Sequence, residues 1–186
     1  MKLSVTHVAP RLTVRAKMLA LLIGIVAAVA LPQICHVAGR AWNIGTGLGE
    51  LLLPMHLPIL AVGLLAGPAV GAIAGLAAPA VSFLLSGMPL VTVLPFMCVE
   101  LCFYGLCAGA LRRVKLPIVA KVLVAQLAGR MARMLAILIG RALGGTALTA
   151  VSTWIAVKNG LPGLAIQWIL IPVLVLLVEK AQKNES

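Results

Sequence analysis

The feature that most constrains this chain is an apolar span, residues 117–143, that carries charged side chains where a membrane helix rarely has any. Gln126, Arg130 and Arg133 lie within this span, and Arg141 lies at its far end. At about 100° per residue, the four fall on one stripe that covers less than about a quarter of the helix circumference. An arginine at membrane depth costs at least ~3 kcal/mol unless it faces a partner or a water-filled cavity. The span therefore predicts a membrane helix whose polar stripe faces an internal site.

The overall composition agrees with a membrane protein. Of the 186 residues, 62% are hydrophobic and 10% are charged, whereas about a quarter of the residues of a soluble domain are charged. This length accommodates roughly six spans of ~20 residues with short loops, and leaves no room for a separate soluble domain. The formal net charge of +11 would suit a nucleic-acid partner, but the basic residues gather at the ends of the spans. We therefore attribute the charge to membrane topology and expect no nucleic-acid partner.

The predicted fold class is an all-α membrane protein, with residues 1–186 forming a single bundle of six transmembrane helices. Residues 1–15 are expected to be a cytoplasmic arm, and the N-terminal apolar run is interpreted as a retained first span, not a cleaved signal. The six spans are expected over about residues 16–31, 55–66, 69–85, 94–111, 117–143 and 161–178. With both termini in the cytoplasm, nine basic residues lie at the inner ends of the spans and three at the outer ends. This asymmetry is the one that the positive-inside rule requires.

Two stretches are too polar and too rich in glycine for spans. Residues 32–54 are expected to form an outer loop that could fold over a site, and residues 144–160 a second outer loop with a short helical piece. Pro54 and Pro58 stand at the start of a short apolar run and predict an interrupted helix, which in transporters often marks a binding site. His56 lies between them and is a candidate binding residue. The alternative is an interfacial histidine that binds water or a loop carbonyl.

Glu100 and Arg130 are expected to lie at the same depth in the membrane. At a rise of ~1.5 Å per residue, Glu100 stands ~20 Å and Arg130 ~22 Å above the inner basic residues, on consecutive antiparallel helices. An ion pair between them would offset the desolvation cost of both charges. Alternatively, Glu100 neutralises one arginine while Arg130 or Arg133 faces an anionic or amide-rich ligand that enters from outside. The stripe carries more positive charge than one glutamate can offset, which favours the second interpretation.

Signals for catalysis or metal binding are weak. A single carboxylate is not an acid/base pair, the sequence has no aspartate, and it has no glycine-rich nucleotide-binding loop. Met55, His56, Cys98 and Cys102 match no standard spacing of metal ligands, and the four cysteines include no CxxC pair. We therefore expect no enzymatic activity, no metal site and no cofactor.

A ridge of small residues runs along the first predicted span. Ala16, Ala20, Gly24 and Ala28 recur at every fourth position, so they share one face on which another helix can approach closely. Two interpretations remain open: packing within this protein, or docking of a separate subunit.

Several short segments together resemble a known family. These segments are 53–58 (LPMHLP), 67–71 (GPAVG), 86–89 (SGMP), 100–105 (ELCFYG) and 160–167 (GLPGLAIQ). In this order and spacing, over about residues 16–180, they are similar to the substrate-binding S components of energy-coupling-factor (ECF) transporters. The histidine-rich N-terminal signature of the cobalt and nickel members of that family is absent, which argues against metal transport.

The resemblance implies a multi-pass subunit in the plasma membrane of a bacterial cell that captures a vitamin or similar micronutrient from outside. It implies three partners in that lipid bilayer and at its inner face, namely a transmembrane coupling subunit and two ATPase subunits. It also implies that Ala16 and Ala20, with Gly24 continuing their ridge, dock against the coupling subunit. The candidate substrate-binding residues, taken from the position of the family's ligands and from the polar stripe, are His56, Glu100, Gln126, Arg130, Arg133, Trp154 and Gln167.

The alternative function is a structural or assembly membrane protein. In that case Glu100 and Arg130 form an internal ion pair that only holds helices together, and the protein binds no ligand.

Overall fold

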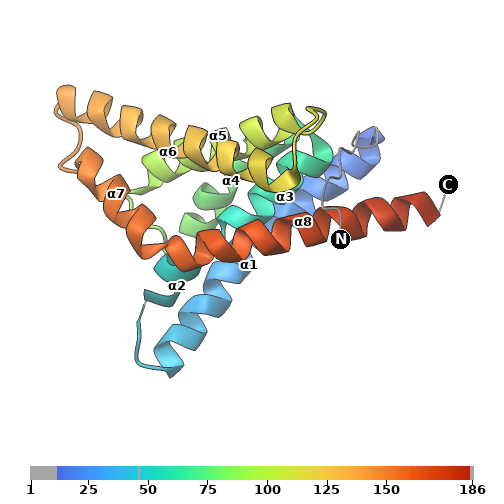
Figure 1. The fold of residues 1–186 in the computed structure, drawn as a ribbon. Coiled ribbons are helices and arrows are strands. Elements are labelled where there is room, and N and C mark those ends of the chain that lie inside the picture. The colour runs from blue at the N-terminus through green and yellow to red at the C-terminus, as the bar shows by residue number, and fades with distance from the viewer. Residues whose placement is uncertain (1–11, 46, 185–186) are drawn as a thin grey trace.

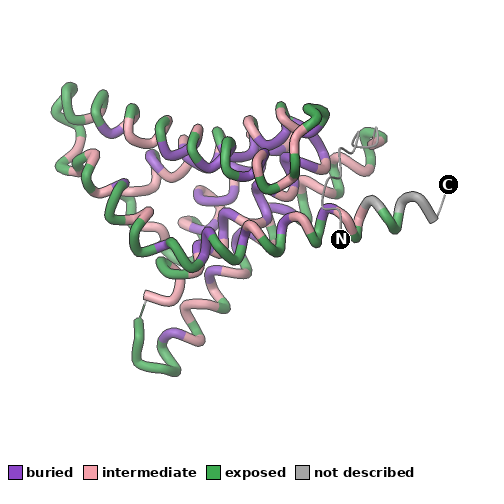
Figure 2. Tube along the Cα trace, in the orientation of Figure 1, coloured by how far each residue is buried: buried purple, intermediate pink, exposed green. Residues whose placement is uncertain are grey.

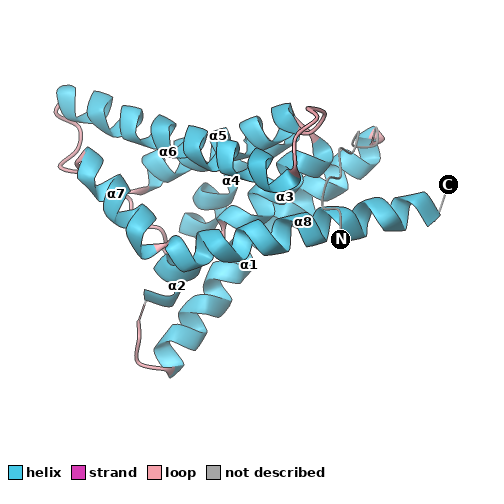
Figure 3. Cartoon of the chain, in the orientation of Figure 1, coloured by secondary structure: helices cyan, strands magenta, loops and turns pink. Residues whose placement is uncertain are grey.

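A computed structural model describes residues 12–45 and 47–184 of the chain. Within these ranges the chain forms eight helices and no strand (Figures 1 and 3). The helices are α1 (Val14–Ala41), α2 (Gly47–Leu52), α3 (His56–Ala66), α4 (Pro68–Ser86), α5 (Leu94–Leu111), α6 (Ile118–Ala142), α7 (Ala150–Asn159) and α8 (Leu161–Asn184). Six segments of the described chain are long and apolar enough to cross a membrane: Val14–Ala41, Gly47–Ala66, Pro68–Ser86, Leu94–Leu111, Ile118–Ala142 and Leu161–Val178. The predicted all-α membrane fold with six spans is thereby confirmed.

The first two spans differ from their predicted limits. α1 continues through Pro32 to Ala41, and α2 adds a helical turn before α3, so the prediction of a loop over residues 32–54 was wrong. Membrane helices tolerate an internal proline because neighbouring groups satisfy the backbone carbonyl that it frees. The helical piece expected within residues 144–160 is α7. Of the predicted cytoplasmic arm, residues 1–11 lie outside the described residues.

The second span is interrupted, as Pro54 and Pro58 predicted. α2 ends at Leu52 and α3 begins at His56. Between them Leu53 has a φ of 48°, a left-handed conformation that a right-handed helix cannot contain. The backbone N–H of His56 donates to the Leu53 carbonyl over 3.1 Å, which fixes the start of α3 directly after the break.

The centre of the bundle is formed by α3, α4 and α5. Ile59, Leu101 and Tyr104 are fully buried there, and Figure 2 shows buried residues concentrated along the inner sides of the helices. The outward faces of α1, α6 and α8 are apolar instead of polar, with Leu22, Leu127 and Ile169 among their exposed side chains. Soluble proteins rarely expose apolar surface on this scale, so these faces are the surface that contacts lipid.

Glycines bring α4 and α5 into backbone contact. A Cβ added at Gly105 would lie 2.0 Å from the Gly71 carbonyl oxygen, and one added at Gly75 would lie 2.1 Å from the Leu101 carbonyl oxygen. Close approach of backbones through small residues is the usual way in which helices associate in lipid. Gly63 on α3 and Gly71 and Gly75 on α4 all meet backbone of α5 in this way, so glycines at four-residue spacing pack these two helices against α5.

Replacement of Gly105 by alanine should force α4 and α5 apart. The added methyl group meets backbone that cannot move independently, so we expect a loss of about 1–3 kcal/mol of stability. The matched control is Gly145→Ala, because a Cβ there lies no closer than 3.5 Å to the Gly140 carbonyl oxygen. Thermal unfolding in detergent would measure both, and equal unfolding temperatures for the two variants would contradict this account of the packing.

Candidate functional site

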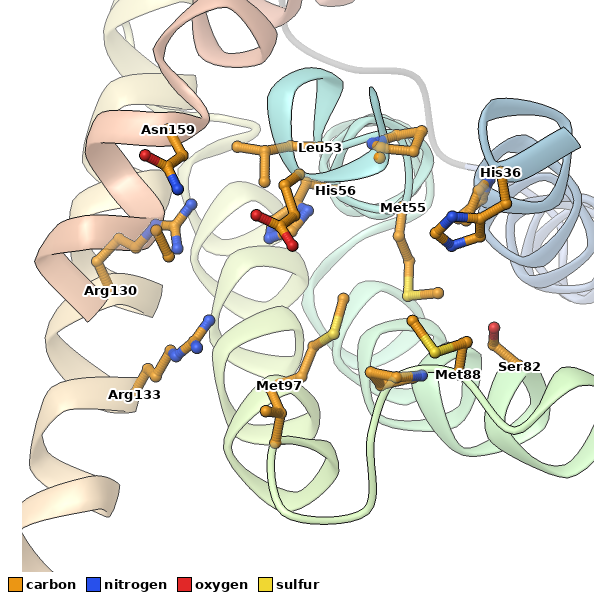
Figure 4. A pocket seen from close by; sticks show the side chains of 17 residues that line it. His36, Leu53, Met55, His56, Ser82, Met88, Met97, Arg130, Arg133 and Asn159 are labelled. Atoms are coloured by element: carbon orange, nitrogen blue, oxygen red, sulfur yellow. The ribbon is translucent and has the colours of Figure 1, made fainter. Parts of the chain in front are cut away.

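A pocket of about 290 Å³ lies at one end of the bundle. Its wall is built by the second half of α1, the break between α2 and α3, the end of α4, the segment that leads into α5, and the facing sides of α6 and α7 (Figure 4). The polar side chains that line it are His36, Glu50, His56, Ser82, Arg130, Arg133 and Asn159. The site is thus assembled from segments distant in sequence.

The electrostatic centre of this site is Glu100, which lies between two arginines. Nη1 of Arg130 lies 2.8 Å from Oε1 of Glu100, and Nη1 of Arg133 donates to Oε2 over 2.8 Å. Glu100 is fully buried, and the side chains of Arg130 and Arg133 are 9% and 11% exposed. The predicted common depth of Glu100 and Arg130 is therefore confirmed. We name these three residues the Arg–Glu–Arg cluster.

Two interpretations of Glu100 were open: a simple ion pair with Arg130, or neutralisation of one arginine while another faces a ligand. The geometry has features of both. Glu100 pairs with both arginines instead of one, and it does not itself line the wall, whereas Arg130, Arg133 and the nearby His56 do. Arg130 and Arg133 line the pocket while they contact Glu100. The cluster is therefore an ion pair between α5 and α6 and, at the same time, the cationic part of the pocket surface.

His56 lies in the pocket wall next to this cluster. It is 4% exposed, and its Nε2 is 3.7 Å from Oε1 of Glu100, beyond hydrogen-bond distance. Its ring packs edge-on against Tyr104, with 5.3 Å between ring centroids. Neither ring nitrogen has a hydrogen-bond partner among the described residues, and Nε2 lies near the Glu100 carboxylate.

Gln126 and Gln167, predicted as ligand contacts, bind each other instead. Nε2 of Gln126 donates to Oε1 of Gln167 over 2.9 Å, and Nε2 of Gln167 donates to the Leu53 carbonyl over 3.3 Å. The indole N–H of Trp168 donates to Oε1 of Gln126 over 2.8 Å. Neither glutamine lines the pocket. This chain of hydrogen bonds links α6 and α8 to the break before α3, so it holds the pocket wall in position.

Trp154 also lies away from the pocket lining, and it is 70% exposed. α7 contributes Ala156 and Asn159 to the wall instead. Met55, Met88 and Met97 also line the pocket, and the sequence did not identify them as pocket residues. Their side chains occupy the middle of the view in Figure 4. A methionine in an apolar segment has no pattern that distinguishes a pocket wall from ordinary packing.

The small-residue ridge of α1 has two environments. At Gly24 it packs against α3, since a Cβ there would lie 2.4 Å from Cγ2 of Val62, and Ala28 is fully buried. Ala16 and Ala20 are partly exposed and, with Gly24, line an apolar groove of about 490 Å³ between α1, α3 and α8. Packing within the protein therefore accounts for one end of the ridge and leaves the other end open.

Comparison of the chain with models of known families, with curated proteins and with solved structures found no match. Within the described residues, no group of three or more His, Cys, Asp or Glu side chains is arranged to hold a metal ion.

Replacement of Glu100 by glutamine should destabilise the protein strongly. The change leaves two buried guanidinium groups without a counter-charge, and removal of one partner of a buried ion pair costs about 3–5 kcal/mol. Glu50→Gln is the matched control, because Glu50 is exposed and loses the same charge. Thermal unfolding in detergent should give a much lower unfolding temperature for Glu100→Gln and one near that of the unchanged protein for Glu50→Gln. Similar temperatures for the two variants would mean that the cluster contributes little to the fold.

Proposed function

We propose that this chain is the substrate-capture subunit of an ECF-type importer, which binds a small vitamin-like molecule from outside a bacterial cell. The observation that carries the proposal is a pocket lined by two arginines, Arg130 buried and Arg133 largely buried, within a bundle of helices long and apolar enough to span a membrane. Charged residues at membrane depth are costly, and where they occur they usually face a substrate pathway or a partner. The sequence resemblance to S components supports the same assignment.

The ends of α5 support an outward-facing pocket. Met97, near the start of this helix, lines the pocket, whereas Arg112 and Arg113, directly after its end, line a basic hollow together with Lys17. Basic residues at span ends favour the cytoplasmic side. The pocket then opens toward the outside of the cell, where a scavenged nutrient arrives.

The size of the pocket suits a small metabolite. Its volume of about 290 Å³ is near the lower limit of ordinary ligand pockets, which run from roughly 300 to 1,000 Å³. The chain has no nucleotide-binding loop, so the energy for import comes from two ATPase subunits through a transmembrane coupling subunit. The apolar groove beside Ala16 and Ala20 is the proposed contact for that coupling subunit, because small residues permit the close approach of a partner helix.

Protein purified in mild detergent should retain one small molecule per chain. Native mass spectrometry would detect it as a mass difference that disappears on denaturation, with a compound recovered in the extract. Arg130→Ala should lose the bound compound, because a wall group that contacts the ligand is removed. Protein that carries no compound, from cells grown in rich medium, would contradict the proposed function.

Ala20→Leu should block coupling without affecting capture. The larger side chain fills the groove where the coupling subunit is proposed to pack, whereas the pocket at the other end of the bundle is unchanged. Val26→Leu is the control, since Val26 is exposed on α1 and does not line the groove. Uptake of the labelled compound into cells should fall for Ala20→Leu only, with the bound compound retained in both purified variants. Normal uptake by Ala20→Leu would exclude this docking surface.

One observation favours a second function. The Arg–Glu–Arg cluster joins α5 to α6 through two close ion pairs, as it would in a structural or assembly protein with no ligand. That function predicts that no small molecule accompanies the purified protein and that charge changes in the cluster alter stability alone.

A further inference from the structure

We infer that the ligand of this pocket is a monocarboxylate, bound as the anion with its carboxylate at Arg130 and Arg133 and its apolar part against methionine side chains. The inference rests on the proposed function and adds the chemical class of the substrate. It is carried by three properties of the pocket: its excess buried charge, its unpaired N–H groups, and the unequal distribution of polar and apolar residues along its wall.

The first property is charge. The Arg–Glu–Arg cluster combines two guanidinium groups with one carboxylate, and all three side chains are at least about nine-tenths buried. Among the described residues Glu100 is the only buried carboxylate, so one positive charge of the cluster has no buried counter-charge there, which is costly in a site shielded from water. The other ionisable groups of the wall are His36, His56 and Glu50, of which Glu50 is exposed and its charge is solvated. A single negative charge on the ligand balances the cluster, and a cationic ligand is repelled.

The second property is the set of N–H groups that Glu100 leaves unused. Arg130 is 8% exposed and directs Nη1 to Glu100, while its Nε and Nη2 have no hydrogen-bond partner among the described residues. Nε of Arg133 likewise has no hydrogen-bond partner among the described residues. The N–H groups on Nε and Nη2 of a guanidinium are parallel, and this is the geometry that receives both oxygens of one carboxylate. Arg130 thus retains a complete carboxylate-binding edge after its contact with Glu100.

The third property is the unequal wall. In Figure 4, Arg130, Arg133 and Asn159 extend from one side, Met55, Met88 and Met97 lie in the middle of the view, and the uncharged end beyond them holds His36 and Ser82. The residues that line this pocket include no Phe, Tyr or Trp, so the body of the ligand contacts flexible thioethers. Such side chains are polarisable and adapt to the shape of an apolar or ring-shaped group. A ligand with an acid at one end and an apolar body would place the acid at the arginines and the body against the methionines.

The cluster also distinguishes a carboxylate from a phosphate ester. A phosphate monoester carries nearly two negative charges at neutral pH, and it would leave the cluster with an excess of negative charge. The volume of about 290 Å³ must accommodate the whole molecule, which leaves little room for a nucleotide-sized ligand. One carboxylate with a small body is the composition that satisfies charge and volume together.

The first experiment identifies the compound released from purified protein by denaturation, using accurate mass and fragmentation. A compound with one carboxylate is expected, and its carboxamide, which has nearly the same shape without the charge, should bind about 10- to 100-fold more weakly by calorimetry. A neutral, cationic or phosphorylated compound would overturn the inference and leave the proposed function standing. Protein without any bound compound would instead overturn the proposed function itself.

The second experiment compares two variants that each lose one positive charge, Arg133→Gln and Arg141→Gln, with a third, Arg133→Lys, that keeps the charge. Arg133→Gln leaves Glu100 paired one-to-one with Arg130, so the variant should fold with its stability unchanged or raised, while affinity for the released acid falls about 10- to 100-fold. Arg133→Lys keeps the charge and should recover part of that loss. Arg141→Gln, at the exposed end of the same helix and outside the pocket lining, removes the same charge and should bind normally.

The readouts of this comparison separate a binding role from a structural one. If Arg133 served only to hold α5 and α6 together, Arg133→Gln would lower the unfolding temperature and leave the affinity of the folded protein for the acid unchanged. Equal affinities of the Arg133→Gln and Arg141→Gln variants for the acid would likewise overturn the inference. The inference would also be overturned if the unchanged protein bound the acid and its carboxamide with equal affinity.

Discussion

The contact of Glu100 with two arginines is the constraint on which the rest of the structure depends. Arginines on a lipid-length helix are costly unless they face a partner or a water-filled cavity, and Glu100 supplies that partner from the adjacent antiparallel helix. Gly129 makes this approach possible, because a Cβ there would lie 1.9 Å from the ring of Tyr104 and 2.7 Å from the Glu100 carbonyl oxygen. The glycine directly before Arg130 thus lets α5 and α6 lie close enough for the side chains to meet.

The polar groups inside the spans fall into two sets with different consequences. In the chain from Trp168 through Gln126 and Gln167 to the Leu53 carbonyl, each side chain has a partner. Buried amides paired in this way stabilise one arrangement of helices and leave little capacity for a ligand. The arginines are different, since unused N–H groups remain after their contact with Glu100. The glutamine chain therefore holds the wall in position, whereas the arginines keep N–H groups that have no hydrogen-bond partner among the described residues.

The sequence was sufficient for the parts of the site that follow from helical geometry. The arginine stripe follows from the angle per residue, and the common depth of Glu100 and Arg130 follows from the rise per residue. The helical course of residues 32–41 did not follow, because Pro32 and the polar residues after it have the composition of a loop. In the structure Gln33, within that stretch, donates to the hydroxyl of Ser86 over 2.8 Å, a contact that no local pattern encodes. Gln126 lies on the same stripe as the arginines, but it hydrogen-bonds to Gln167 on another helix instead of lining the pocket. The sequence of α6 alone does not reveal this difference.

An ion pair between α5 and α6 does not by itself explain why two arginines share one carboxylate. One arginine would suffice to neutralise Glu100 and to join α5 to α6, and a second buried guanidinium adds desolvation cost without adding an anion. In a purely structural protein this second charge would be a net disadvantage, and an apolar residue of similar size would pack at least as well. Both arginines share the one carboxylate of Glu100, and both also line the pocket. A protein that stores an uncompensated cation beside a pocket is less stable empty than occupied, which is the energetic condition for tight capture of an anion.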